Sequence, residues 1–521
     1  MKPQIVHIIN FIRGAEPRDP GLDLVESVRG QLELLRRHGL KGTFLLQYDA
    51  LIREDIVELL LAQRDDRLEY GVWLETMQPL VQDAGIPWRG RFSWDWHTDV
   101  GFSISYTPQD REKIVDVLME KFRSVFGQYP CSVGSWFIDA HTLDYLCRKY
   151  GIVACCNCKD QWGTDGYTLW GGYYNQAYYP SRRNSFAPAQ RAEQQIPVPV
   201  FRMLGSDPIY QYDTGMDENF NPTECQNVYT LEPVYPACGG SPGWIDWFLR
   251  ENFTPRTLSF GYAQAGQENS FGWQAMKDGL AYQCEQFARL QAEGRLAVQT
   301  LEESGRWFRQ RYPLTPASTL LARTDWRGEQ RQSLWYCSRF YRVNLFFEQG
   351  RLWVRDIYLF DGEYEERYLR EKCDSSACTY DNLPVMDGNR YSGDGVRAGV
   401  YLVNGAGHPL VGEAPAAELV GEDAMAVRWP VASGALEIIC RPDELEFRGV
   451  GLDAWELAFV AAARAMLPVE SISGNELRLR HEGYAYRLWA KRGHFAGAAG
   501  RPVAKPEAGA VCWRMAQVGA E

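Results

Sequence analysis

The chain carries near its N-terminus the stretch Gln4-Ile-Val-His-Ile-Ile-Asn-Phe11, followed by an amphipathic segment over 24–35 and then by Gly42-Thr-Phe-Leu-Leu46. The first and third of these stretches are short and almost wholly apolar, as the buried strands of a parallel sheet are. The segment between them places Leu and Val on one helical face and is followed by His38-Gly39, a typical helix stop. The order strand, helix, strand predicts a parallel sheet with a crossover helix.

The same alternation continues to about residue 310. Further strands are expected over 69–74, 132–138, 152–156, 198–204 and 257–262, with a short one over 296–300. Further helices are expected over 56–61, 107–126, 141–150 and 273–293. Strand and helix signals repeated to about seven strands predict a (β/α)7-type barrel.

The pattern changes after Arg311-Tyr-Pro313. From about residue 320 onward the chain has short runs of alternating polarity, such as those over 334–341 and 352–359, separated by turns that contain Gly and Asp. Such runs are typical of an antiparallel β-sandwich. We therefore predict an α/β chain of two domains, a (β/α)7-type catalytic barrel over 1–312 and a C-terminal β-sandwich domain over 313–521.

The composition limits the possible partners. The 521 residues include 55 Lys and Arg against 67 Asp and Glu, a formal net charge of −12, so there is no basic surplus for nucleic acid or an anionic membrane. No stretch reaches the ~18 apolar residues of a membrane helix, and the N-terminal apolar run lacks the features of a signal peptide. The 13 Cys show no disulfide framework, so we expect a cytoplasmic protein.

Acidic and amide side chains follow most of the predicted barrel strands. The active site of a parallel barrel lies at the carboxyl ends of its strands, so these residues are candidates for a site. Those selected as candidates are Arg13, Gln47, Glu75, Asp95, Asp139, Asp160, Asp165, Asp207, Gln267 and Glu268. An Asp that follows a strand is also a common helix N-cap or turn residue, and only the recurrence over several strands favours a site.

Aromatic residues lie beside the same strand ends, among them Trp96, Trp136 and Trp170, and the chain has 18 Trp and 28 Tyr in all. Aromatic faces pack on the C–H faces of sugars, and carboxylates accept hydrogen bonds from sugar hydroxyls. A pair of carboxylates also hydrolyses glycosidic bonds, one as acid and the other as nucleophile or base. The pattern therefore indicates an oligosaccharide or glycoside substrate.

One stretch, Gly134-Ser-Trp-Phe-Ile-Asp139-Ala, precedes a predicted helix that ends before Gly151-Ile152. It resembles the nucleophile motif of glycoside hydrolase family 57, although that motif ends in Glu. Relatives in family 38 use Asp. The wider superfamily comprises (β/α)7 barrels and includes polysaccharide deacetylases. The resemblance implies Asp139 as the nucleophile of a retaining glycosidase.

A second stretch, Gly266-Gln-Glu-Asn-Ser-Phe-Gly-Trp273, is similar to the acid motif of the same family. The resemblance implies Glu268 as the general acid and base, although Gln267 falls at the position that aligns with the family's acid. Asp207 is the alternative acid. The remaining candidates, with Glu75 among them, would bind the sugar, and no metal or cofactor is expected.

Two alternatives stay open. The first is a metal-dependent carbohydrate deacetylase, for which His7, Asp95 and His97 are conceivable ligands. The second is a carbohydrate-binding protein without catalysis, in which the acids only accept hydrogen bonds. The sequence does not separate hydrolysis from transglycosylation, and a homo-oligomer with contacts through the sandwich is compatible with it.

Overall fold

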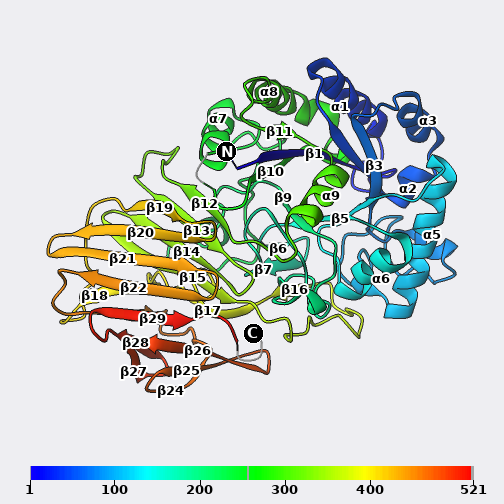
Figure 1. Cartoon of the computed structure of the whole chain (residues 1–521). Helices are drawn as coiled ribbons and strands as arrows, with labels where there is room; N and C mark the ends of the chain where they lie inside the picture. The colour runs from blue at the N-terminus through cyan, green and yellow to red at the C-terminus, as the bar shows by residue number, and fades with distance from the viewer. Residues whose placement is uncertain (1, 255–256, 518–521) are drawn as a thin grey trace.

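The computed structural model describes residues 2–254 and 257–517. Within this part of the chain, seven parallel strands form a curled sheet in the order β10-β1-β2-β3-β4-β5-β9 (Figure 1). They are β1 (Gln4–Ile12), β2 (Gly42–Leu46), β3 (Leu68–Trp73), β4 (Ser132–Gly134), β5 (Ala154–Cys158), β9 (Val200–Met203) and β10 (Gly261–Ala265). Two short strands extend the sheet, β11 (Ala297–Val298) on β1 and β8 (Ala177–Tyr178) on β9. The predicted barrel is confirmed.

Helices cover the outside of this sheet (Figure 1). They are α1 (Leu24–His38), α2 (Tyr48–Leu51), α3 (Glu54–Ala62), α4 (Gln78–Asp83), α5 (Pro108–Phe126), α6 (Ala140–Tyr150), α7 (Pro242–Asn252), α8 (Trp273–Ala292) and α9 (Leu301–Arg311). Helix α9 was not predicted, although Thr300 and Glu303 form a capping box at its start. The last barrel strand also differs from the prediction, because β10 begins at Gly261 and the preceding residues form a turn in which Thr257 Oγ1 donates to Phe260 O.

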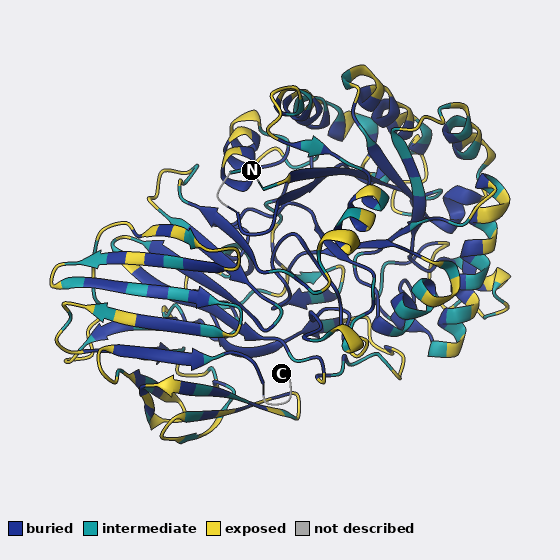
Figure 2. Ribbon diagram, viewed as in Figure 1, coloured by how far each residue is buried: buried dark blue, intermediate teal, exposed yellow. Residues whose placement is uncertain are grey.

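Strand β1 shows why the barrel closes around an apolar interior. Ile9 and Phe11 belong to the core inside the barrel, and Ile8 and Ile12 belong to the core shared with the helices. This follows from the two-residue period of a strand that is covered on both faces. His7 points inward as well and is hydrogen-bonded through its ring to Ser304 Oγ at 2.7 Å and to Tyr262 Oη at 3.2 Å. Figure 2 shows the resulting arrangement, with buried strands and helices exposed on their outer faces.

The barrel has one seam without a backbone ladder, between β9 and β10. Side chains close it. Leu204 N donates to Gln264 Oε1 at 2.7 Å, and the rings of Phe201 and Tyr262 lie 5.4 Å apart. Strand ends on either side of the seam therefore still meet at one edge of the barrel.

The C-terminal half consists of two antiparallel sheets that share one hydrophobic core, so the predicted sandwich is confirmed. The first sheet contains β12 (Ser318–Ala322), β13 (Gln332–Cys337), β14 (Tyr341–Glu348), β15 (Arg351–Leu359), β17 (Leu383–Asp387), β18 (Gly399–Asn404), β23 (Trp455–Val460), β27 (His494–Ala498) and β28 (Arg501–Lys505). The second contains β19 (Ala416–Val420), β20 (Ala424–Val431), β21 (Gly434–Arg441), β22 (Glu444–Val450), β24 (Val469–Ser473), β25 (Glu476–His481), β26 (Tyr484–Arg492) and β29 (Ala510–Arg514).

Barrel and sandwich are joined by buried contacts. A hairpin of β6 (Gln161–Thr164) and β7 (Tyr167–Trp170) leaves the barrel and pairs in parallel with β16 (Cys378–Asp381) of the second half. Tyr174 stacks on Trp335 with ring centroids 3.7 Å apart. The predicted boundary at 312/313 falls between α9 and β12, and the division into two domains stays a prediction.

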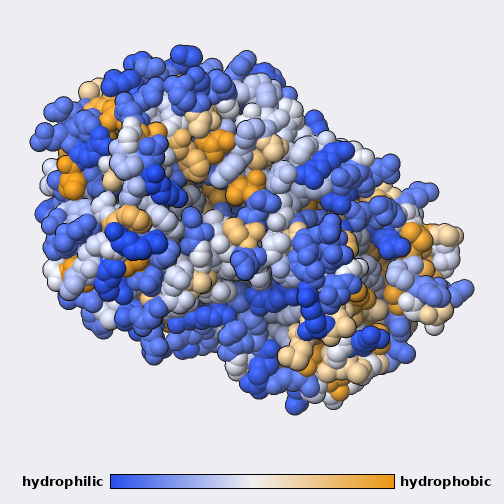
Figure 3. Space-filling view, turned by 180° about the vertical axis from the view of Figure 1, so that it is seen from behind, coloured by the Kyte–Doolittle hydropathy of each residue, from blue (hydrophilic) through white to orange (hydrophobic). Residues whose placement is uncertain are grey.

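The surface seen from behind is largely hydrophilic, with hydrophobic residues in several separate groups (Figure 3). Among the described residues no helix combines the length and the apolar character needed to span a membrane.

Candidate active site

Four charged side chains meet at the carboxyl edge of the barrel, and we call them the Arg13 cluster. Arg13 Nη2 lies 3.0 Å from Glu268 Oε2 and 3.3 Å from Glu75 Oε2, and Arg13 Nη1 lies 4.0 Å from Glu16 Oε2. All four side chains are at least 95% buried. The cluster thus joins the loops after β1, β3 and β10 around one guanidinium.

Local backbone geometry brings these residues together. Gly266 has φ +99°, and a Cβ there would lie 2.1 Å from Ile9 O, so only glycine lets the end of β10 pass this close to β1. Asn269 then fixes the loop after β1, because its Oδ1 accepts from Arg13 N at 2.8 Å and its Nδ2 donates to Arg13 O at 2.9 Å. Glu268 is held beside Arg13 by this pair of hydrogen bonds.

Burial changes the protonation of two carboxyl groups at this edge. It raises the pKa of Glu75 to about 7, against the lowering effect of Arg13, and Gln47 Nε2 donates to Glu75 Oε2. It also raises the pKa of Glu232 to about 7. Glu232 accepts from Thr230 Oγ1 at 2.8 Å and from Gln267 Nε2 at 3.3 Å. The edge therefore holds carboxyl groups that change protonation near neutral pH.

Aromatic rings form one wall of the cluster. The guanidinium of Arg13 lies 3.8 Å from the centroid of Trp94, and that of Arg18 lies 5.1 Å from both Trp94 and Trp96. Trp136 is partly exposed and packs edge-on against Trp73 at 5.1 Å. Flat apolar faces and charged groups thus adjoin, as in a sugar-binding site.

Several buried polar atoms at this edge have no hydrogen-bond partner among the described residues. They are Asn10 Nδ2, Arg13 Nε, Gln47 Oε1 and Gln267 Oε1. Buried polar atoms are normally paired, because leaving one unpaired costs about 1–3 kcal/mol. Donors and acceptors that the protein leaves unpaired at one edge suit a ligand that carries both, as sugar hydroxyls do.

Asp139, predicted as the nucleophile, lies in a different group of contacts. It caps α6, where it accepts from Thr142 N at 2.9 Å and Thr142 Oγ1 at 2.7 Å, and it accepts from Ser103 Oγ at 2.6 Å. Arg111 Nη1 lies 3.0 Å from Asp139 Oδ1, the oxygen that also accepts from Thr142 N. Burial acts to raise the pKa of Asp139, but Arg111 and these hydrogen bonds lower it below its ordinary value. Its catalytic role stays a prediction.

Three other candidates face the sandwich. Asp207 accepts from Trp244 Nε1 at 2.9 Å and from Trp326 Nε1 at 2.8 Å. Asp160 lies 2.5 Å from Arg342 Nη1 of β14, and Trp170 Nε1 donates to Asp387 Oδ2 at 3.0 Å. These contacts hold the two halves of the chain together.

The remaining candidates lie on loops. Asp95 pairs with Arg91 at 2.8 Å, and Asp165 is exposed in the turn between β6 and β7 with φ 47°. The charge of Asp165 contributes to the raised pKa values of Glu75 and Arg18. The hairpin turn therefore acts on the Arg13 cluster through its charge.

Five of the predicted candidates lie together at this edge of the barrel, namely Arg13, Gln47, Glu75, Gln267 and Glu268. Glu232, which lies 29 residues beyond the end of β9, was not among the predicted candidates. No strand or motif precedes Glu232, so the sequence offers no signal for it. Trp94 and Asn269 stand next to candidates, and neither was selected.

A divalent cation does not fit this set of donors. Among the described residues no group of three or more His, Cys, Asp and Glu side chains is placed to hold a metal. Arg13 already supplies the positive charge beside Glu75 and Glu268, with its Nη2 at 3.3 and 3.0 Å from their carboxylates. Of the conceivable ligands, His7 lies inside the barrel with its ring nitrogens bonded to Ser304 and Tyr262, and Asp95 pairs with Arg91. The donors of the Arg13 cluster therefore do not fit a divalent cation.

Comparison with known proteins gives the fold. No protein-family model matches the chain, and no curated protein matches it significantly. The crystal structure of a proposed glycoside hydrolase/deacetylase from Parabacteroides distasonis is similar, with a TM-score of 0.57 and 15% identity over 74% of this chain and 91% of that one. The chain shares the fold of that structure.

Two proposed polysaccharide deacetylases are more distant. The one from Mycobacterium smegmatis has a TM-score of 0.37 and 13% identity, and the one from Pseudomonas aeruginosa PAO1 has a TM-score of 0.36 and 12% identity. Each match covers 60% of this chain and 93% of the other.

Proposed function

We propose that the chain is a carbohydrate-active hydrolase that cleaves glycosidic bonds with retention of configuration, with Glu75 and Glu268 as its carboxyl pair. The observation that carries the proposal is their common contact with Arg13 Nη2, at 3.3 and 3.0 Å. Their contacting oxygens are therefore no more than about 6.3 Å apart. Retaining enzymes hold the two carboxyl groups ~5–5.5 Å apart, whereas inverting enzymes hold them ~6.5–9.5 Å apart.

The two carboxyl groups have different environments, which suggests different roles. Glu75 is the proposed general acid, because burial raises its pKa to about 7 and keeps the acid form present near neutral pH. Glu268 is the proposed nucleophile, since its Oε2 is the carboxylate oxygen nearest to the Arg13 guanidinium. This assignment departs from the sequence prediction, which gave the acid role to Glu268 and the nucleophile role to Asp139.

The reaction then has two steps. Glu268 attacks the anomeric carbon while the bond to the leaving oxygen breaks, and Glu75 gives its proton to that oxygen. A water molecule next attacks the anomeric carbon and breaks the bond to Glu268, and its proton goes to Glu75. A second sugar in place of water would give transglycosylation.

The partners of Asp139 explain why the proposal does not use it. Thr142, Ser103 and Arg111 engage both of its oxygens at 2.6–3.0 Å. Two donors engage each oxygen of Asp139, which leaves it no lone pair for a substrate. Among the described residues Glu268 has one contact on each oxygen, Ser270 Oγ at 3.0 Å and Arg13 Nη2 at 3.0 Å, so it keeps lone pairs for a substrate.

The test is a panel of α- and β-linked glycosides, with the anomer of the first product followed by proton NMR. We expect cleavage of at least one glycoside and a product with the configuration of the substrate. An inverted product would reject Glu75 and Glu268 as a retaining pair. The absence of cleavage across the panel, with release of acetate from acetylated sugars instead, would favour the deacetylase.

A further inference from the structure

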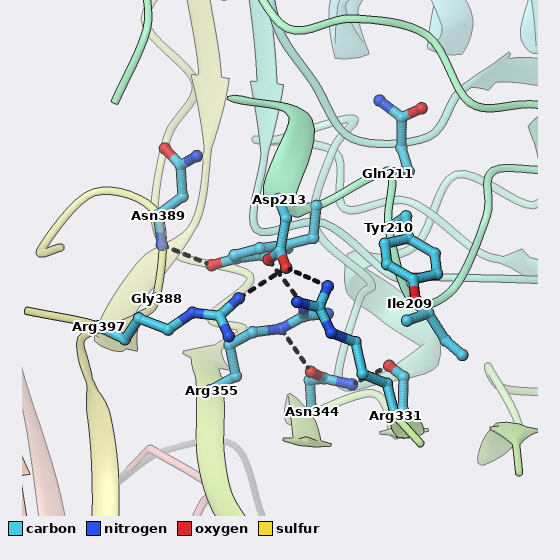
Figure 4. A network of polar contacts seen from close by, with 12 residues as sticks. Ile209, Tyr210, Gln211, Asp213, Arg331, Asn344, Arg355, Gly388, Asn389 and Arg397 are labelled. Carbon is cyan, nitrogen blue, oxygen red and sulfur yellow. Dashed lines mark hydrogen bonds and ion pairs between the residues drawn. The ribbon is translucent and has the colours of Figure 1, made fainter. Parts of the chain in front are cut away.

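The loop after β9 is fastened to the sandwich by arginines that surround Asp213 (Figure 4). Arg331, Arg355 and Arg397 contact its carboxylate at 3.4, 3.3 and 2.6 Å. Arg331 and Arg397 also pair with Glu348, at 2.6 and 2.5 Å. These arginines and carboxylates neutralise one another, and the proposed function uses none of them.

Arg327 stands beside this network in a different environment. Its guanidinium lies 4.1 Å from the ring centroid of Tyr210, 4.8 Å from that of Trp326 and 5.1 Å from that of Tyr229. Throughout the described part of the chain, no carboxylate forms an ion pair with it. Cation–π contacts hold a guanidinium by its face and leave its N–H edge able to bind an anion in a bidentate manner.

Arg327 lines a pocket of about 300 Å³. Tyr210, Tyr229 and Phe220 supply aromatic walls, and the pocket lies between the loop and the sandwich. Asp217 also lines it, but the oxygens of Asp217 accept from Asn219 and Asn221 at 2.8 Å. A volume near 300 Å³ is at the lower limit of small-molecule sites, which suits a single sugar ring.

The pocket is also close along the chain to Glu232, at the barrel edge that carries the Arg13 cluster. Tyr229 lines the pocket, and Glu232, three residues later, contacts Gln267 at 3.3 Å. Three residues of extended chain span at most about 11 Å. A ligand in the pocket therefore lies within a few sugar rings of the proposed catalytic carboxylates.

We propose that this pocket binds an anionic sugar, whose carboxylate or sulfate group pairs with Arg327 and whose ring packs beside Phe220. The choice of a sugar as the ligand rests on the proposed function, since the pocket would then take an acidic residue of the same glycan. The binding of the anionic group rests only on Arg327 and its aromatic neighbours.

Isothermal titration calorimetry with D-glucuronate, D-glucose 6-sulfate and D-glucose tests the proposal. We expect at least one charged sugar to bind about 10-fold or more tightly than glucose, because a charge-assisted bidentate contact is worth that much or more. The comparison of the two charged sugars shows which anionic group is preferred. Equal affinities for all three sugars, or no binding of either charged sugar, would overturn the proposal.

Variants locate the binding. Arg327→Gln should weaken the charged sugar about 10-fold or more, while Arg327→Lys should retain part of the affinity. Arg487→Gln is the matched control, because Arg487 also lies over an aromatic ring, Trp489 at 5.7 Å, but outside the pocket. Unchanged affinity in Arg327→Gln, or an equal loss in Arg487→Gln, would contradict the assignment.

The two proposals fail separately. Glu268→Gln should leave binding of the charged sugar unchanged, because Glu268 does not line the pocket. A charged sugar that binds to a protein without glycosidase activity would reject only the proposed function. Glycoside cleavage without discrimination between charged and neutral sugars would reject only the anionic pocket.

Discussion

The barrel half of the molecule has two buried groups in which an arginine contacts carboxylates, namely the Arg13 cluster and Arg111 with Asp139, which we call the Arg111 group. They differ in how many of their polar atoms have hydrogen-bond partners. In the Arg111 group, Arg111 donates to main-chain oxygens and to Asp139, and both oxygens of Asp139 have partners. In the Arg13 cluster, Arg13 Nε and the neighbouring Gln47 Oε1 have none among the described residues. Burial is alike in both, so the satisfaction of hydrogen bonds is the difference that we use to separate scaffold from candidate site.

The largest expected effect is on catalysis in the Arg13 cluster. Glu268→Gln should lower kcat/KM by about 10³-fold or more, because loss of a catalytic carboxylate removes a step that no neighbour replaces. Hydrolysis of the cleaved glycoside by the purified variant measures this. Glu303→Gln is the control, since Glu303 forms an exposed pair with Lys41 and should keep full activity.

Near wild-type activity in Glu268→Gln would remove the Arg13 cluster as the site. A normal melting temperature must accompany the loss, because a variant that has unfolded says nothing about catalysis.

The next effect is on stability in the Arg111 group. Asp139→Asn leaves Arg111 buried without its counter-charge and weakens the cap of α6, which should cost about 3–5 kcal/mol of unfolding free energy. Urea unfolding measures the loss. Activity per folded molecule should stay close to that of the wild type.

A loss of activity without a loss of stability in Asp139→Asn would contradict this prediction. A stable Asp139→Asn variant without activity would restore Asp139 as the nucleophile, as the sequence motif implies, and would reject the division between the two groups.

The difference between the Arg13 cluster and the Arg111 group also shows how much of the fold and of the site the sequence predicts. The apolar strand of β1 and the cap Thr107 with Pro108 predicted their elements well, because a two-residue period and a helix cap are local signals. Asp139 and Glu75 both follow strands, and nothing local distinguishes them. Their roles depend on partners from distant segments, such as Arg111 on α5.

The smallest expected effect is a pH dependence of kcat/KM, which again distinguishes the Arg13 cluster from the Arg111 group. The acid form of Glu75 is needed for the first step, so kcat/KM should fall as the pH rises through about 7, the pKa to which burial raises this carboxyl group. Measurement of kcat/KM between pH 5 and 9 shows whether this fall occurs. A glycoside whose leaving group departs without a proton should not show this fall of kcat/KM, because departure of that leaving group does not depend on Glu75.

Stability must be followed in the same buffers, because Glu366, a buried carboxyl group that the second half of the chain places beside Asp139, changes protonation in the same pH range. Burial and the charge of Asp139 raise the pKa of Glu366 to about 8, and its carboxyl accepts from Ala140 N at 2.9 Å. A carboxyl group with a raised pKa favours the folded state while it is protonated, so unfolding free energy should decline as the pH rises toward 8. A loss of activity near pH 7 at a constant folded fraction would belong to Glu75 as the acid, whereas a loss that follows the melting temperature would come from unfolding and would contradict the proposed acid.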